Sequence, residues 1–327
     1  MEITVSALHA LAILAALRCA ACHAATGRGS DAATATPIRV AHLGAEGGDA
    51  EGFEALRRDF ARRNPGYDVE WRDTLDGFEA AGRHVVAFIQ AGSSEARVVD
   101  RGSQWTGADP ALTTGDVVLL RPGEQLSVAS ALSAVVFSVP EPFPRDLPTF
   151  VRPDWDVRIT DTPGGCAEET GAYRRILLTW LETVGPYVYR ALNCHRVRIT
   201  DSFSHYHPLE GGFDEFYLVQ MVQPGAVLYT SDGTGRIEDP AAVTRAEAPR
   251  LFEKHPLEVG DLVYLPRGTI HRGFGGVLAQ IITAPGFRPG AEIGVDHHLR
   301  AINERLGLTG GDALPYREAS ASRAVVK

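Results

Sequence analysis

The sequence predicts a mainly β protein made of two β-barrels that are joined by a proline-rich segment. Two regions, about 83–140 and 186–288, consist of short apolar runs separated by Gly, Pro, Ser and Asp, which is the pattern of strands and turns. The chain has 34 Gly and 20 Pro among 327 residues, so turns are frequent. Residues 115–123 (GDVVLLRPG) parallel residues 260–268 (GDLVYLPRG), and this echo predicts a duplicated fold.

The charge and the apolar content exclude two classes of partner. The formal net charge is -9, and a phosphate backbone repels an acidic chain that has no Lys/Arg cluster, so we expect no nucleic acid partner. The apolar run at residues 5–17 is too short to cross a bilayer, so we expect no integral membrane span. We expect a small-molecule substrate, and a homodimer is an open alternative to a single chain.

Residues 1–25 have the apolar run and the small-residue end of a secretory signal peptide. Glu2 stands where a Lys or Arg is usual, and Arg18 interrupts the end of the apolar run. Two interpretations stay open. One is export to the periplasm or the medium, and the other is a disordered leader or misplaced start on a cytoplasmic protein. Residues 26–36 are small and polar, which predicts a linker.

Two cysteines, Cys166 and Cys194, lie beyond this leader. In an oxidising compartment they could form a disulfide. Nothing in their sequence positions fixes the geometry that a disulfide needs, so two separate buried thiols remain an equal alternative.

Residues 37–145 are predicted to form the first β domain. A short amphipathic helix precedes its strands, because residues 51–63 place Phe53, Leu56 and Phe60 at helical spacing. The dipeptide at residues 65–66, Pro-Gly, ends that helix. The strand-like runs that follow are residues 85–90, 96–100, 116–120, 126–128 and 133–139.

Residues 146–185 are predicted to form a linker followed by a helix. Residues 140–170 are rich in proline. Residues 171–183 (GAYRRILLTWLET) carry an apolar stripe with helical spacing. The residues of this stripe are Tyr173, Ile176, Leu177 and Trp180.

Residues 186–290 are predicted to form the second β domain. Within it, residues 196–200 (RVRIT) alternate between apolar and polar side chains, as a half-buried strand does. Residues 291–327 form a C-terminal helix and tail, in which the helix spans residues 296–306 and begins with Asp296 as its cap.

Three histidines and a glutamate form a candidate metal site in the second domain. His205 and His207 are two residues apart, so on a strand both imidazoles face the same side. Glu215 begins a second strand-like run, and His271 follows a strand and a tight turn. Three imidazoles and one carboxylate suit one divalent transition metal (Fe, Mn, Ni, Co, Cu or Zn) better than Mg or Ca.

These residues resemble the two motifs of the cupin superfamily. Residues 260–271 match the second motif, G-x5-P-x-G-x2-H, at every fixed position, but Gly275 stands where Asn is usual. The first motif matches at its HxH, whereas Glu215 lies later than usual and Glu210 lies too early. Glu215 precedes a β-type run and Glu210 precedes a Gly-Gly turn, so Glu215 is the predicted ligand and Glu210 the alternative.

The resemblance implies a bicupin, with two jelly-roll barrels in one chain. The metal site then belongs to the C-terminal cupin domain. The N-terminal barrel is degenerate and metal-free, because no histidine occurs between Val85 and Val139.

Strand alternation predicts which other side chains face the metal. Phe203, Tyr217 and Val219 share parity with the ligands of their own strands. The Tyr217 hydroxyl is the candidate catalytic group, which would orient a substrate or act as an acid or base; simple packing is the alternative. Weaker candidates are Tyr264, Arg272 and Gln280.

The remaining histidines are predicted to play no part in the site. His297 and His298 are adjacent on a helix and point about 100° apart. His195 and His255 are predicted to be loop or edge residues.

Three functions fit such a site, and the fold cannot choose between them. The leading hypothesis is a metal-dependent enzyme on a small oxygen-rich organic substrate, a dioxygenase-type oxidoreductase. The second is a redox-neutral isomerase, epimerase or lyase for a sugar or sugar acid. The third is a non-enzymatic cupin that binds a small ligand or metal.

Overall fold

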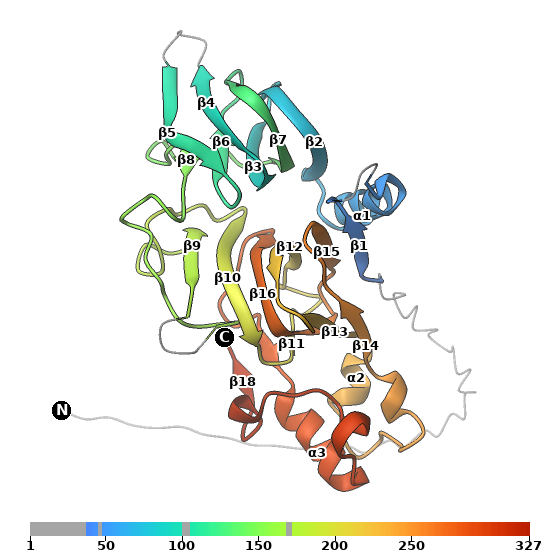
Figure 1. The fold of residues 1–327 in the computed structure, drawn as a ribbon. Coiled ribbons are helices and arrows are strands. Elements are labelled where there is room, and N and C mark those ends of the chain that lie inside the picture. Colours follow the sequence, from blue (N-terminus) through green and yellow to red (C-terminus); the bar gives the residue numbers. More distant parts are fainter. Residues whose placement is uncertain (1–36, 45–47, 100–104, 168–171) are drawn as a thin grey trace, which may run out of the picture. The chain divides into compact units, whose positions relative to one another are not determined.

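The computed structural model describes residues 37–44, 48–99, 105–167 and 172–327. The predicted leader and linker, residues 1–36, lie outside the described residues. Strands dominate the described chain (Figure 1), which confirms the predicted mainly β fold class. None of the helices in these ranges is long and apolar enough to cross a membrane.

The first sheet contains seven strands within the described residues. Six of them form a path in the order β5-β4-β7-β3-β6-β8. The seventh, β2, lies off this path and pairs with β7. The bounds are β2 Asp68–Glu79, β3 His84–Ala91, β4 Ser93–Val99, β5 Trp105–Thr113, β6 Val117–Leu120, β7 Gln125–Val139 and β8 Phe150–Val151.

The second sheet contains eleven strands in the part of the chain that the structure describes. Its main path is β1-β15-β12-β16-β11-β17-β18, with β10, β9, β13 and β14 branching from it. The bounds are β1 Arg39–His42, β9 Arg174–Leu178, β10 Asn193–Asp201, β11 His205–Tyr206, β12 Asp214–Val222, β13 Val227–Ser231, β14 Glu253–Pro256, β15 Asp261–Leu265, β16 Ile270–Ala284, β17 Ile293–Gly294 and β18 Val325–Val326.

The two sheets repeat one pairing scheme. In the first, the 15-residue strand β7 pairs with β2, β3 and β4; in the second, the 15-residue strand β16 pairs with β10, β12 and β13. The pairs β3–β6, β4–β5 and β6–β8 correspond in turn to β12–β15, β13–β14 and β15–β1. The duplication that the short sequence echo predicts therefore extends over six strand pairings.

The two similar segments, residues 115–123 and 260–268, form the same local structure. Gly115 and Gly260 enter the strands β6 and β15 with φ of 98° and 95°, and Gly123 and Gly268 close the following turns with φ of 86° and 97°. Glycine adopts such positive φ values at little steric cost. The same glycine positions therefore set the same strand and turn in both sheets.

Strand β1 pairs with β15 of the second sheet, although it precedes all strands of the first sheet along the chain. Strand β1 therefore lies beside β15 in the second sheet as β8 lies beside β6 in the first. The domain boundaries given above stay a prediction, but the first domain's opening strand contributes its hydrogen bonds to the second sheet.

Helix α1 (Ala50–Arg63) confirms the predicted amphipathic helix. Asp49 caps it by accepting a hydrogen bond from Gly52 N at 2.8 Å. Its inner face packs into a core that both sheets share, where the Phe60 ring lies 5.0 Å from that of Phe216 and 5.9 Å from that of Phe137. Burial of such rings contributes most of the stability of this junction.

The predicted helix over residues 171–183 is wrong, because residues 174–178 form strand β9. This strand pairs with β10, so Ile176 lies opposite His195 and Leu178 opposite Cys194. Ile176, Leu177 and Leu178 are all buried. The apolar spacing fits a helix and a fully buried strand equally well, and tertiary pairing decides between the two.

Other elements differ from the predictions in smaller ways. Strands β2 and β5 were not predicted, since their sequences carry charged and small residues in place of a clear alternation. Helix α3 (Asp296–Leu306) has the predicted bounds, but its N-cap position is Val295 rather than Asp296; Gly307 follows the helix with a left-handed φ of 60°. The short helix α2 spans Thr234–Ile237.

Candidate metal centre

The three histidines of the predicted site come together in the second sheet. His205 lies on β11 and pairs directly with His271 at the start of β16. His207 follows β11, and its carbonyl oxygen accepts a hydrogen bond of 2.7 Å from Gly268 N in the turn before β16. The HxH segment and the second motif are therefore neighbours in space, as their placement on two adjoining strands requires.

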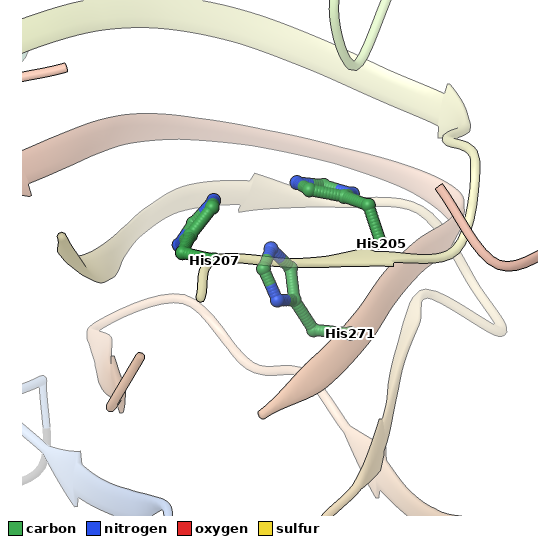
Figure 2. A group of neighbouring side chains, drawn as sticks. All are labelled: His205, His207 and His271. Carbon is green, nitrogen blue, oxygen red and sulfur yellow. The ribbon is translucent and has the colours of Figure 1, made fainter. Parts of the chain in front are cut away.

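The three imidazoles form one buried cluster (Figure 2). Their ligand nitrogens lie within 4.8 Å of one another, and all three side chains are buried. His205 Nδ1 and His271 Nδ1 each lie 3.2 Å from a backbone carbonyl oxygen, of Phe203 and Thr269. Such contacts fix the ring orientation and leave Nε2 for a metal.

Glu215 lies at the edge of this cluster. Its Oε1 is 3.3 Å from His271 Nε2, and its Oε2 is 3.8 Å from His207 Nε2. Glu215 pairs with Leu265 and Thr283 in the centre of the sheet, so its strand is held on both sides. The carboxylate thus reaches two of the three imidazoles, as the predicted fourth ligand must.

The nitrogen and oxygen atoms that the three histidines and Glu215 offer are suited to bind a metal ion. Four of them have no hydrogen-bond partner among the described residues although they are buried, namely the Nε2 atoms of His205, His207 and His271 and Oε1 of Glu215. Buried polar atoms are rarely left unpaired. Nitrogen and oxygen donors that converge in this way support one divalent transition metal, with Glu215 as a proposed ligand.

Burial also keeps two of the imidazoles in their neutral form by lowering their pKa. It lowers the pKa of His205 and of His207 well below the usual value, and the neighbouring His271 lowers both further. Both rings are therefore neutral near pH 7, the form that coordinates a metal.

Asp214 anchors the strand that carries Glu215. Its carboxylate accepts hydrogen bonds from Asn64 Nδ2 at 2.6 Å, Tyr264 Oη at 2.7 Å and Arg267 Nε at 2.8 Å. Burial is the largest single influence and would raise the pKa of Asp214, but the hydrogen bonds and positive charge of Arg267 and the hydrogen bond from Tyr264 together outweigh it, so the pKa is lowered. This ionised carboxylate ties helix α1 and the turn after β15 to the start of β12.

Two of the three predicted neighbours of the metal, Phe203 and Tyr217, have rings next to those of the histidines. The Phe203 ring stacks on His205, with centroids 4.3 Å apart and an interplanar angle of 14°. Tyr217 and Val219 are buried in the apolar core of the same sheet. The Tyr217 ring lies 6.3 Å from that of His271, and its hydroxyl is near the Cys166 thiol.

The weaker candidates serve structural contacts elsewhere. Gln280 donates to the Gly115 carbonyl oxygen at 2.8 Å, and Arg272 Nε donates to that of Ser202 at 3.0 Å. Tyr264 bonds Asp214, as described above. The pairing of β12 with β16 shifts its register between Val219 and Met221, opposite Ala279 and Leu278.

The other cysteine, glutamate and histidine candidates lie outside the histidine cluster. Cys166 and Cys194 are separate free thiols, both buried. Glu210 is exposed in the turn before β12. His297 and His298 contact each other with ring centroids 3.9 Å apart and are not part of the histidine cluster.

A cavity of about 330 Å³ opens beside the cluster and reaches Glu215. The sequence reasoning missed its other polar residues. Among them His195 lies within β10, which pairs with a strand on each side, so its predicted place in a loop or at an edge is wrong, whereas His255 does lie on the edge strand β14. The polar side chains in the cavity wall are Arg174, Asn193, His195, Glu215, Thr283, Glu292 and Lys327.

One signal could have found part of this wall. Arg174, Ile176 and Leu178 alternate on one strand and all line the cavity. The helix assignment hid that alternation. Glu292 and Lys327 come from segments without a motif, so only the fold brings them to the cavity.

Comparisons with known proteins identify similar structures. No family model matches the chain, and no curated protein matches it either. An IolB-like protein from Salmonella typhimurium has 16% identity over 72% of this chain and 89% of that chain, with a TM-score of 0.46. An oxalate decarboxylase from Lactobacillus farciminis, in complex with formate, has 13% identity over 78% and 85%, with a TM-score of 0.42. A variant of the Bacillus subtilis oxalate decarboxylase has 13% identity over 76% and 74%, with a TM-score of 0.40.

Proposed function

We propose that the protein is a metal-dependent enzyme that acts on a small organic substrate, with His205, His207, Glu215 and His271 as the metal ligands. The observation that carries the proposal is the convergence of four buried donor atoms without partners next to a cavity. A metal that is merely structural is usually enclosed by its ligands, whereas a catalytic one keeps a position open to a substrate.

We propose an oxygenase reaction first. A redox-active metal held by these imidazoles and the Glu215 carboxylate would supply Lewis-acid or redox chemistry when bound. The protein's own part is to keep the imidazoles neutral and to surround the reacting atoms with apolar walls. Phe203 at the cluster and Phe287 in the cavity wall provide such surfaces.

A redox-neutral isomerase or lyase is the second candidate, and Glu292 favours it. Burial, followed by the nearby Glu215 carboxylate, raises the pKa of Glu292 to about 7. A carboxyl group with such a pKa in a cavity can take up and release a proton during a reaction.

The experiment is to purify the protein anaerobically, measure its metal content, and follow oxygen uptake with a panel of small organic acids and sugars. The oxygenase proposal expects oxygen consumption that depends on both metal and substrate. Substrate turnover that continues without oxygen would replace it by the redox-neutral reaction. Metal-loaded protein that changes no substrate in either condition would contradict both.

A further inference from the structure

The cavity beside the metal centre contains a second group of unpartnered polar atoms. Arg174 Nε, His195 Nε2 and Thr283 Oγ1 are buried and have no hydrogen-bond partner among the described residues, as is also true of Glu215 Oε1. These atoms come from four strands, β9, β10, β16 and β12, that lie next to one another. Such a convergence in one cavity indicates the place of a ligand rather than of a packed core.

Arg174 is the cation in this group. Its Nη1 donates to the Thr162 carbonyl oxygen at 3.0 Å. Its guanidinium lies against Gly164 and Gly165, where an added Cβ would be 3.6 Å from Nη1 and from Nη2 respectively. In the described part of the chain no carboxylate forms an ion pair with it, and burial lowers the pKa of Arg174. The Glu292 carboxylate on the same cavity attracts this guanidinium at longer range, but an anion in direct contact would offset more of the cost of removing its charge from water.

The charge around the cavity also favours an anion. Lys327 Nζ lies 4.5 Å above the Phe203 ring, which stacks on His205. A divalent ion together with Arg174 would outweigh the negative charge of Glu215 and Glu292. An anionic ligand reduces this excess, so it binds better than a neutral ligand of the same shape.

The register places the cation away from the metal. Arg174 lies opposite Val197 on β10, while Glu215 lies opposite Thr283 on β16. Strands β9 and β12 are separated by β10 and β16, so Arg174 and Glu215 lie three strand spacings apart across the sheet, roughly 14 Å if it is flat, and four residues apart along β16. A ligand that touches both ends must carry its anionic group at a distance from the atoms at the metal.

The wall between these ends is mainly apolar. Ile176 and Leu178 line it from β9. The Phe287 ring lies 4.0 Å from Trp180 and 5.4 Å from Phe213, which in turn lies 4.0 Å from the His207 ring. This wall fits an apolar or aromatic ligand body better than a sugar.

We propose that the cavity binds an organic acid, whose carboxylate is held by Arg174 and whose apolar body extends towards the metal centre. Carboxylate binding follows from the cavity residues alone. That the bound acid is a substrate rests on the proposed function. Arg174 is then the residue that selects acids over neutral analogues. A guanidinium can hold a carboxylate through two parallel hydrogen bonds, which gives both affinity and orientation.

The test is direct binding by calorimetry to the protein as purified, with the metal content of every sample measured. The probes are three acids and their uncharged amides: acetate and acetamide, hexanoate and hexanamide, phenylacetate and phenylacetamide. We expect hexanoate or phenylacetate to bind at least about tenfold more tightly than its amide, because only the acid forms a charge-assisted pair.

The variants are Arg174→Gln and, as the matched control, Arg175→Gln. Arg175 follows Arg174 on the same strand but pairs with Asp154 at 2.7 Å and Asp161 at 3.1 Å. Arg174→Gln is expected to remove the preference for the acid and leave the metal content unchanged. Arg175→Gln is expected to leave both unchanged. If Arg174→Gln does not fold, Arg174→Lys takes its place and is expected to keep a reduced preference for the acid.

The outcomes separate this inference from the proposed function. Acids that bind no better than their amides, or an acid preference that persists in Arg174→Gln, overturn the inference even if the enzyme turns over a substrate. Acid binding that depends on Arg174 in a protein without catalytic activity upholds the carboxylate site and contradicts the proposed function.

Discussion

In the first sheet, the positions that correspond to the ligands Glu215 and His271 hold Val85 and Leu126. Leu126 lies three residues after Gly123, as His271 lies three residues after Gly268. Both Val85 and Leu126 are buried in an apolar cluster that fills this sheet.

The correspondence of Val85 with Glu215 follows from strand pairing. Val85 of β3 lies opposite Leu120, the last residue of β6. Glu215 of β12 lies opposite Leu265, the last residue of β15. One backbone scheme therefore supports two kinds of interior. Apolar side chains in the first sheet contribute stability, and polar side chains in the second form a site.

The largest expected effect is on metal affinity. His205→Ala removes one imidazole, and the affinity is expected to fall by more than roughly 100-fold, since even the loss of an outer partner of a ligand costs about 10–100-fold. Equilibrium dialysis followed by metal analysis measures it. Unchanged affinity in a folded variant would show that the cluster is not the metal site.

The corresponding change in the first sheet is expected to act on stability alone. Leu126→Ala leaves a cavity in a closely packed core, so the free energy of unfolding is expected to fall by about 3 kcal/mol while metal content stays the same. Urea unfolding and metal analysis of the same sample check both. A loss of metal in this variant would mean that the first sheet also contributes to the site.

The choice of carboxylate is the next test. Glu215→Gln is expected to lower metal affinity at least about tenfold, because it replaces a charged ligand by a neutral amide. Glu210→Gln changes an exposed turn residue and is expected to have no effect. If Glu210→Gln lowers metal affinity and Glu215→Gln does not, Glu210 is the ligand and the assignment of Glu215 is wrong.

The pH dependence of the metal-free protein is expected to come from buried histidines of the second sheet. Burial lowers the pKa of His195, His205 and His207 well below the usual value. The unfolded chain therefore binds more protons than the folded one as pH falls below about 6.5.

It follows that this contribution to stability is complete above about pH 6.5 and is lost on acidification below it. Urea unfolding between pH 7.5 and about pH 5 measures the slope. His205→Asn is expected to make the slope shallower. A slope that is the same in both proteins would contradict the assignment to these rings.

The smallest expected effect concerns Tyr217. Its buried hydroxyl is near only the weakly polar Cys166 thiol, and burial raises its pKa. Tyr217→Phe is therefore expected to change the free energy of unfolding by less than about 1.5 kcal/mol and to leave metal affinity unchanged. A large fall in turnover with unchanged stability would support its predicted role in orienting the substrate.

The motif spacing predicted the metal cluster because the site is built from local turns and strand parity. Two imidazoles two residues apart share a face, and a glycine-rich turn brings His271 beside His205. The cavity could not be predicted in the same way. Arg174 and His195 face it only because β9 pairs with β10, and Glu292 and Lys327 arrive from remote segments.

The predictions failed where one pattern fits two structures. The apolar residues of β9 satisfy helical spacing as well as a buried strand, so the pairing with β10 decides. Strand β1 pairs with the second sheet across more than half of the chain, which no local pattern reveals.

The number of metal ions per chain tests the central claim most directly. It can be measured by metal analysis and by mass spectrometry under native conditions on the same anaerobic sample. If the second sheet carries the metal site and the first sheet carries an apolar core, the protein binds one divalent transition metal per chain and His271→Ala binds none. A second ion per chain, or a full complement of metal in His271→Ala, would contradict this account.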